Sequence, residues 1–323
     1  MAKRAIGLLL VSFHLFGFGC GGSTAISNPA HDAIPPKPNS YLPEQAAFFL
    51  AIDFQGLRAT RLAAPLDELL RTSPMWKRLA GELPFKPIQE LDTLAVAGES
   101  PYGPRYWLVA YHQKGDTLPR VPLENLAHAT NRTLEWSDLG GIQSTTLPMD
   151  WEVAHTLLIT APDEFLIVPK EESASIAEHA RAVASHRART SAFRDPALDL
   201  LRDKILTLRM EGGWPERPGW PPSPESYTLT IVRLPSSHTM FGFSIDARFA
   251  TEAKAQAAAH QIAATLKSHA DDFLIRSAGL DRVLRNLEIK ASGSALEIHG
   301  DLSEEEALRL IGAFQLLQSF GGS

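Results

Sequence analysis

The sequence has a single cysteine among its 323 residues, and that cysteine lies at position 20, close to the N-terminus. The rest of the chain therefore forms no internal disulfide, and the folded body depends on its hydrophobic core for stability. The length suffices for this, because a body of about 280 residues buries about three quarters of the surface that its unfolded chain exposes.

The short motifs of the common enzyme classes are also absent. The sequence contains no G-x-S-x-G elbow, no phosphate-binding P-loop, no G-x-G-x-x-G fingerprint and no H-E-x-x-H metal motif. It therefore predicts no catalytic residue, no metal ligand and no cofactor. An enzyme with a site peculiar to its own family stays open as an alternative.

An excess of positive charge is likewise missing. The chain carries 31 basic and 37 acidic residues, a net charge of −6, and removal of Lys3 and Arg4 with an N-terminal leader would leave −8. Nucleic-acid binders use clustered Lys and Arg to neutralise phosphates. The acidic balance therefore argues against a nucleic-acid partner.

The N-terminus is typical of an export signal over residues 1–19. Lys3 and Arg4 precede an apolar stretch from Ala5 to Phe18. At about 1.5 Å rise per residue, that stretch is too short to span a hydrocarbon core of roughly 30 Å comfortably. A basic start, a short apolar run and small residues at its end predict a signal peptide.

The segment Phe16–Cys20 ends this run with the sequence FGFGC. It resembles the lipobox of bacterial lipoproteins, in which a small residue, here Gly19, precedes the cysteine that is acylated. The resemblance implies cleavage before Cys20, a lipid anchor on Cys20 and, because Gly21 follows it, sorting to the outer membrane. The alternative is an ordinary signal peptide in which the cysteine falls by chance.

Residues 21–40 are rich in Gly, Ser, Asn and Pro and show no apolar periodicity, so they predict a tether. The body begins at Tyr41 and mixes alternating apolar runs with amphipathic ones. We expect strands at 46–54, 93–97, 105–111, 134–147, 157–160, 164–168, 205–210, 227–234, 240–249, 287–290 and 295–299, and helices within 62–79 (two, the second starting at Pro74) and at 122–130, 171–189, 196–203, 251–268 and 303–317.

This order predicts an α+β fold in which antiparallel sheets carry helices on one face. Each half can be written as helix, two strands, helix, two strands, helix. The sequence therefore suggests two similar units in tandem, residues 41–190 and 191–323.

Near its start the body has Leu42-Pro43, which is followed by the run Ala51–Arg58 (AIDFQGLR). In these residues the chain resembles exported lipoproteins of myxobacteria, which carry a lipobox, a polar linker and then such a strand. The resemblance covers the first quarter of the chain and implies no activity.

Three clusters of titratable residues lie on the predicted helices. His179 and His186 are two turns apart, about 10 Å, too far to bind one ion together, and are interpreted as solvent-facing. His269 with Asp271 and Asp272 is interpreted as a solvated helix end rather than an acid–base site. Glu304, Glu305 and Glu306 suit the positive end of a helix, where Ser303 opens a capping box.

The segment 212–224 (GGWPERPGWPPSP) holds Trp214 and Trp220 among five prolines and three glycines. A rigid loop that presents tryptophans is a candidate contact surface, since Trp is enriched at interface hot spots. Alternatively, both rings fold back and cover the sheet.

Together these features favour a membrane-anchored envelope lipoprotein with a non-catalytic binding or scaffold role and an envelope protein as partner. The alternative is a periplasmic carrier that holds an apolar ligand between a sheet and its helices, for which a large apolar pocket is required.

Overall fold

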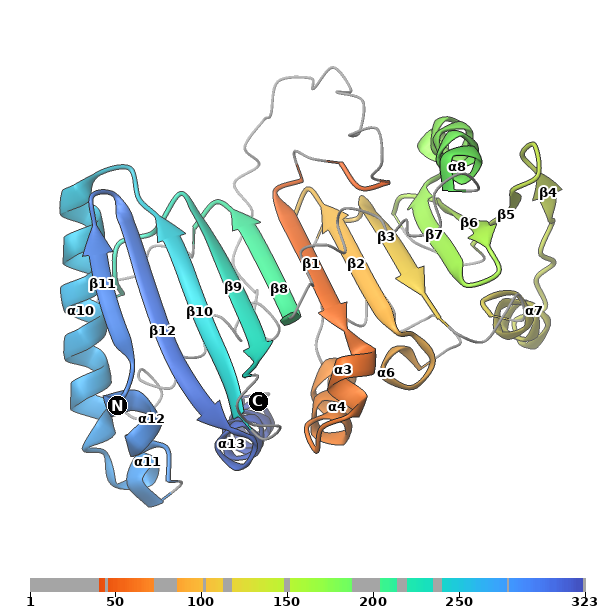
Figure 1. Cartoon of the computed structure of the whole chain (residues 1–323). Coiled ribbons are helices and arrows are strands. Elements are labelled where there is room, and N and C mark those ends of the chain that lie inside the picture. The colour runs from red at the N-terminus through yellow and green to blue at the C-terminus, as the bar shows by residue number, and fades with distance from the viewer. Residues whose placement is uncertain are drawn as a thin grey trace. The chain divides into compact units, whose positions relative to one another are not determined.

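The computed structural model describes residues 41–43, 46–72, 86–100, 103–112, 118–147, 152–187, 204–213, 220–234, 240–277 and 279–321. These residues form two compact units (Figure 1). The N-terminal unit comprises residues 41–55 and 86–187, and the C-terminal unit comprises residues 56–72 and 204–321. The predicted boundary near residue 190 lies outside the described residues.

The N-terminal unit is built on an antiparallel sheet whose strands follow the order β1-β2-β3-β7-β6-β5-β4. Short helices connect the strands, and α8 closes the unit. The elements are β1 (Phe48–Asp53), the start of α3 (Phe54–Arg58, whose residues from Gly56 on belong to the C-terminal unit), α6 (Pro87–Glu90), β2 (Thr93–Gly98), β3 (Tyr106–Tyr111), α7 (Arg120–Ala129), β4 (Ser137–Asp138), β5 (Gln143–Thr146), β6 (His155–Ala161), β7 (Glu164–Pro169), the 3-10 turn η3 (Lys170–Glu172) and α8 (Ser173–Arg187).

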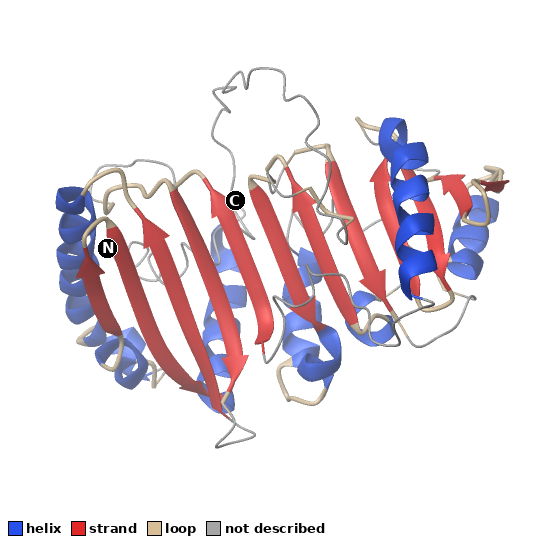
Figure 2. Ribbon diagram, turned by 45° about the horizontal axis from the view of Figure 1, so that its top comes forward, coloured by secondary structure: helices blue, strands red, loops and turns tan. Residues whose placement is uncertain are grey.

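Both faces of this sheet are buried along its central strands. Consecutive residues of a strand point to opposite faces of the sheet. This holds for Leu50 and Ala51 in β1 and for Ala95 and Val96 in β2, and all four side chains are fully buried. On one face Ile176 and Ala180 of α8 pack against the strands, and Figure 2 shows α8 in front of β6 and β7. A strand that is buried on both faces has a continuous run of apolar residues, such as FFLAID in β1, instead of alternating apolar and polar residues.

The C-terminal unit is built on strands in the order β11-β12-β10-β9-β8, which are also antiparallel throughout. Helices α10 and α13 lie behind its sheet in Figure 1. The elements are α4 (Ala63–Thr72), β8 (Lys204–Glu211), β9 (Ser226–Arg233), β10 (Met240–Arg248), α10 (Glu252–Ala270), α11 (Phe273–Ser277), α12 (Asp281–Arg285), β11 (Glu288–Ser292), β12 (Ala295–Ser303) and α13 (Glu304–Gly321).

The two units share part of their chain path. Each has three consecutive strands, then a helix (α7 or α10), and later a strand that pairs back onto the third (β7 on β3, β12 on β10). They differ in that the N-terminal unit has two further strands, β4 and β5, between α7 and β6. Each ends with a helix, α8 or α13. The tandem duplication suggested by the sequence stays a prediction.

The α+β class with antiparallel sheets is confirmed, but one predicted strand is divided. Residues 134–147 form the short hairpin of β4 and β5 instead of one strand. Gly140 and Gly141 have φ of +69° and +93°, a left-handed turn that reverses the chain between them. The predicted helices at Pro74 and at 196–203 lie outside the described residues.

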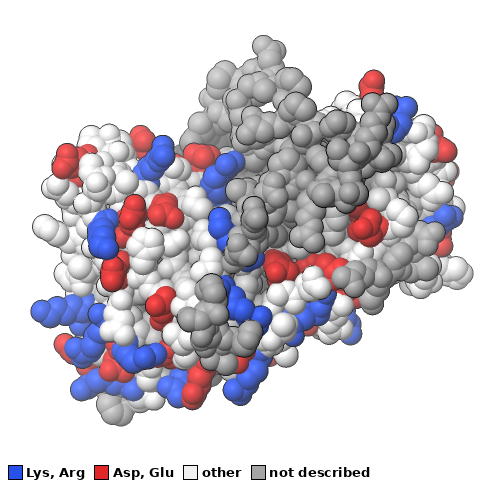
Figure 3. All heavy atoms as spheres, viewed as in Figure 1, with Lys and Arg blue, Asp and Glu red and all other residues white. Residues whose placement is uncertain are grey.

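The sheet of the C-terminal unit has two unlike faces. On one face alternate residues such as Leu229, Phe241 and Leu296 turn toward the helices and are buried. On the other, Asp246 and Glu297 are exposed, and Figure 3 shows acidic and basic side chains interspersed on this side of the unit. The helix-bearing face is therefore where a buried site can form.

Candidate functional site

An apolar cavity of about 160 Å³ lies between the sheet of the C-terminal unit and its helices. We call it the apolar slot. Strand β10 forms its floor, because the alternate side chains Phe241, Phe243, Ile245 and Ala247 all line it. A strand that alternates in this way turns one side chain in two toward the helices, so its even-numbered residues face away from the slot.

The strands on either side of β10 extend the floor in register. Ile245 lies opposite Leu229 of β9 and Ile298 of β12, and all three line the slot. Residues directly opposite in an antiparallel ladder share a face. The pairing thus produces four rows across three strands, and these are Tyr227–Ala247–Leu296, Leu229–Ile245–Ile298, Ile231–Phe243–Gly300 and Arg233–Phe241–Leu302.

The third row depends on a glycine. A Cβ at Gly300 would lie 2.5 Å from Leu287 Cδ2 and 2.8 Å from the Phe243 ring. Leu287 and Phe243 both line the slot, so the missing side chain at Gly300 leaves the space in which they pack.

Three helices form the roof of the slot. Helix α10 contributes Ile262 and Leu266, one turn apart, and α13 contributes Leu310 and Ile311. Leu66 of α4 closes a third side. The apolar side chains come from residues far apart in sequence, and only the tertiary structure brings them together.

The slot is not sealed. Phe243, Ile245 and Leu287 face the helices yet remain partly exposed, as does Leu66. Cores of folded proteins are normally packed to the density of organic crystals. Large apolar side chains that are partly exposed beneath their own helices therefore indicate open space that solvent or a ligand can reach.

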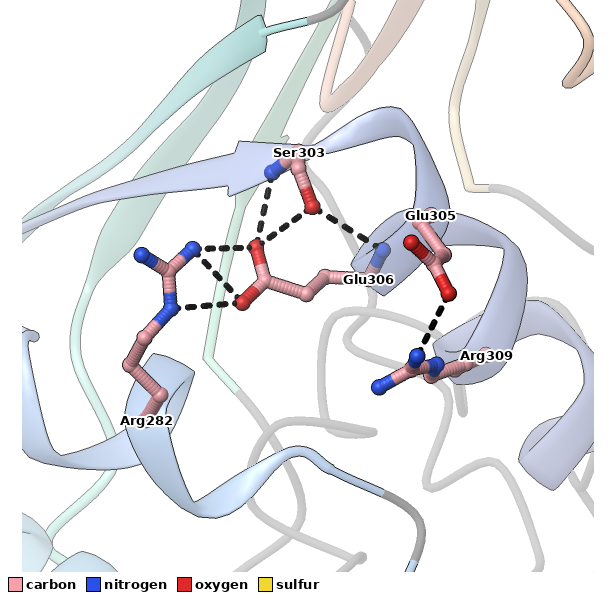
Figure 4. A network of polar contacts seen from close by, with 5 residues as sticks. All are labelled: Arg282, Ser303, Glu305, Glu306 and Arg309. Atoms are coloured by element: carbon pink, nitrogen blue, oxygen red, sulfur yellow. Dashed lines mark hydrogen bonds and ion pairs between the residues drawn. The ribbon is translucent and has the colours of Figure 1, made fainter.

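Polar contacts hold the first turn of α13 beside the slot (Figure 4). Glu306 Oε2 accepts hydrogen bonds from Ser303 N and Ser303 Oγ, both at 2.8 Å, while Ser303 Oγ accepts one from Glu306 N at 3.2 Å. Arg282 of α12 donates to both oxygens of Glu306 at 2.8 Å. The predicted capping box is confirmed, and it is tied to a second helix.

Glu304 and Glu305 also have specific partners. Glu304 is buried and accepts a hydrogen bond from Arg61 N at 2.6 Å, next to the slot residue Leu62. Glu305 pairs with Arg309 at 2.5 Å, one turn further along α13. The acidic run thus anchors α13 to its surroundings as well as suiting the helix dipole.

The histidines chosen from sequence have other roles. His179 is half-buried rather than solvent-facing, because its ring packs edge-on against Tyr41, 5.9 Å between centroids. The side chain of His186 lies outside the described residues. Asp271 ends α10 and pairs with Arg285 of α12 at 2.6 Å, as expected of a solvated helix end.

The predicted contact loop is described only in part. Cys20 and Trp214 lie outside the described residues. Trp220 is half-buried, and the adjacent Pro221 lines the slot. The contact surface at Trp214 and Trp220 stays a prediction.

The described residues contain no group of three or more His, Cys, Asp or Glu placed to hold a metal ion. None of the helices within the described stretches has the length and apolar character needed to cross a membrane. Comparison with protein-family models, with curated proteins and with solved structures found no match for this chain.

Proposed function

We propose that this chain is a lipid-anchored protein of the bacterial cell envelope that binds an apolar ligand in the slot of its C-terminal unit. The role is binding rather than catalysis. The part of the chain that lines the slot is almost wholly apolar, which suits the retention of an apolar group and offers no acid, base or nucleophile to change it chemically.

The observation that carries this proposal is unfilled apolar volume at the centre of a unit. An empty closed apolar cavity costs about 24 cal/mol per Å³, so on the order of 4 kcal/mol is an upper bound for an open slot of this size. That is a large part of the 5–15 kcal/mol by which domains are typically stable. A ligand that fills the slot would recover much of this cost, which gives the slot affinity for apolar groups.

The size of the slot limits the ligand. A cavity of about 150 Å³ lined by Leu, Ile and Phe accommodates a molecule such as benzene. The slot, at about 160 Å³, accommodates a ligand of similar volume or a short apolar segment of a larger one. It does not accommodate a whole two-chain lipid.

Binding can be tested with N-phenyl-1-naphthylamine, a neutral apolar dye that fluoresces when removed from water. The full chain carrying Cys20→Ser, which has no lipid of its own, should enhance its fluorescence. Ala307→Phe adds a ring from α13 into the slot and should abolish the enhancement. Ala253→Phe, on the exposed face of α10, is the matched control and should leave it unchanged. Equal enhancement by all three chains would place the dye elsewhere and refute the proposal.

The anchor is tested separately. Cells fed a clickable fatty acid should label the wild-type chain and not Cys20→Ser, and the labelled chain should fractionate with the outer membrane. Equal labelling of both chains would remove the anchor from the proposal without affecting the slot.

A further inference from the structure

Phe243 gives the apolar slot an aromatic surface. It lies in the third row of the floor, where its partner on β12 is Gly300. The ring atoms Cε1 and Cζ of Phe243 both lie 2.8 Å from the point that a Cβ of Gly300 would occupy. The ring therefore leans sideways over β12, into the space that the glycine leaves, instead of rising toward the helices.

Part of this ring remains accessible from the slot. Three of the described residues that line the slot are aromatic, and of these Tyr227 and Phe241 are only 4% and 2% exposed. Phe243 is partly exposed, although Gly300 and Leu287 lie against one end of its ring. The aromatic surface that a ligand can reach in the slot is therefore chiefly that of Phe243.

The side of the slot opposite the floor is aliphatic. Helices α10 and α13 contribute Ile262 and Leu310 to the roof. A flat ligand that lies on Phe243 would therefore have an aromatic ring on one side and aliphatic side chains on the other.

The volume and the polarity of the slot narrow the ligand further. A volume of about 160 Å³ suits a single ring with small substituents, because an apolar cavity of about 150 Å³ takes up one benzene molecule. Apart from the hydroxyl of Tyr227, the described side chains that line the slot carry no polar group. A charged group would lose its hydration there without gaining a partner, which is costly.

We infer that the apolar slot binds a small, uncharged molecule with one aromatic ring, and that Phe243 sets its preference for aromatic over saturated hydrocarbons. This inference rests on the proposed function and names the ligand class. Offset or edge-to-face contact between two aromatic rings strengthens binding about two- to tenfold beyond the effect of the area that they bury. Gly300 is a positioning residue, because the absence of its side chain lets the Phe243 ring lie down on the floor.

Benzene and cyclohexane test the inference, because both are uncharged six-carbon rings and only benzene is aromatic. Each is titrated calorimetrically in a sealed cell into the full chain with Cys20→Ser, and each affinity is divided by the partition coefficient of the ligand between water and hexadecane. On this scale benzene should bind about two- to tenfold more tightly than cyclohexane. Benzoate, compared directly with benzene, should bind at least about tenfold more weakly, because its charge loses hydration in the slot.

Phe243→Leu removes the ring and keeps an apolar side chain, so it should abolish the preference for benzene while cyclohexane still binds. Phe249→Leu is the matched control, because Phe249 is a buried phenylalanine of the same unit that is not among the residues lining the slot. It should leave the preference unchanged. The comparison of the two hydrocarbons in the chain with Phe243 intact decides the ligand class even if Phe243→Leu does not fold.

The possible outcomes separate this inference from the proposed function. Equal binding of benzene and cyclohexane on the partition scale would overturn the aromatic preference and leave the apolar site standing. A preference that persists in Phe243→Leu would overturn the role of Phe243. Benzoate binding as tight as that of benzene would overturn the restriction to uncharged ligands, and binding of none of the three would overturn both proposals.

Discussion

Glu306 joins two helices and the end of a strand through a single carboxylate. Burial raises the pKa of this carboxyl, but the hydrogen bonds from the Ser303 backbone and hydroxyl and from Arg282 outweigh burial, so the pKa lies below its ordinary value of 4.5. A lowered carboxyl pKa stabilises the fold above the unfolded value, and that stabilisation is lost as the pH falls below about 4.5.

Glu306→Gln should therefore lower the free energy of unfolding at neutral pH by about 1.5–3 kcal/mol, the range for a hydrogen bond to a charged group. It should also reduce the loss of stability on acidification. Urea denaturation between pH 3 and pH 7 measures both, with Glu305→Gln as control, because Glu305 makes an exposed pair with Arg309 that contributes little. Equal losses for both variants would show that the carboxylate of Glu306 has no special role.

His155 is the second residue with a clear pH signature, and it lies in the N-terminal unit. It is buried, stacks on Tyr106 at 4.3 Å between ring centroids, and its Nδ1 lies 2.8 Å from the Val153 carbonyl oxygen. Burial lowers its pKa below 6.5, although backbone hydrogen bonds and Glu171 partly oppose this. The unfolded chain thus takes up the proton at a higher pH than the folded chain does.

Stability should consequently decline as the pH falls below about 6.5, the value at which the unfolded histidine is protonated. His155→Phe, which keeps a ring stacked on Tyr106, should flatten this decline between pH 6.5 and pH 5. Thermal melts across that range measure it. An unchanged decline in the variant would assign the pH dependence to another group.

At the scale of elements, regular patterns in the sequence predict regular structure. The alternation in 227–234 and 240–249 yields β9 and β10, and Thr251 caps α10 by accepting a hydrogen bond from Lys254 N at 3.3 Å. The helices that the sequence did not predict are short: α3, α6, α11 and α12 have four or five residues each. A segment of one turn has no periodicity to detect, and tertiary packing decides its conformation.

The slot could not be located from sequence for a related reason. Its apolar residues alternate visibly along β9, β10 and β12, which predicts a buried face but not whether helices fill the space above it.

The pairing of β10 with β12 gives a prediction at this scale. Gly300→Ala should destabilise the fold by about 1–3 kcal/mol, because the added methyl overpacks the site between Phe243 and Leu287. Gly312→Ala, in α13, meets nothing within 4 Å and should stabilise the fold by about 0.5–1 kcal/mol through helix propensity. Chemical denaturation of both variants measures the difference, and the same sign of change in both would contradict this account of the slot wall.

For the whole molecule, the two units share part of a chain path but differ in their interiors. The N-terminal unit buries both faces of its sheet, whereas the C-terminal unit has one polar face and an open slot beneath its helices. The proposed binding site therefore belongs to the unit whose interior is left open.

The N-terminal boundary of the body is a prediction at this scale. Tyr41 and Leu42 are 3% and 4% exposed and belong to the core that includes Phe49 and Val109. A chain that begins at Ser40 should therefore melt at the same temperature as one that begins at Gly21. One that begins at Ala46 should melt several degrees lower, because two buried side chains are lost. A lower melting temperature for the Ser40 chain alone, relative to Gly21, would make the tether part of the fold.

The most direct test of the slot as a binding site is methyl NMR of the full chain carrying Cys20→Ser, with labelled isoleucines, during titration with N-phenyl-1-naphthylamine. Ile245, Ile262 and Ile298 line the slot, while Ile52 and Ile167 are buried in the N-terminal unit and serve as internal controls. The account predicts saturable shifts confined to the slot methyls. Shifts of equal size at Ile52 and Ile167, or none at the slot methyls, would contradict it.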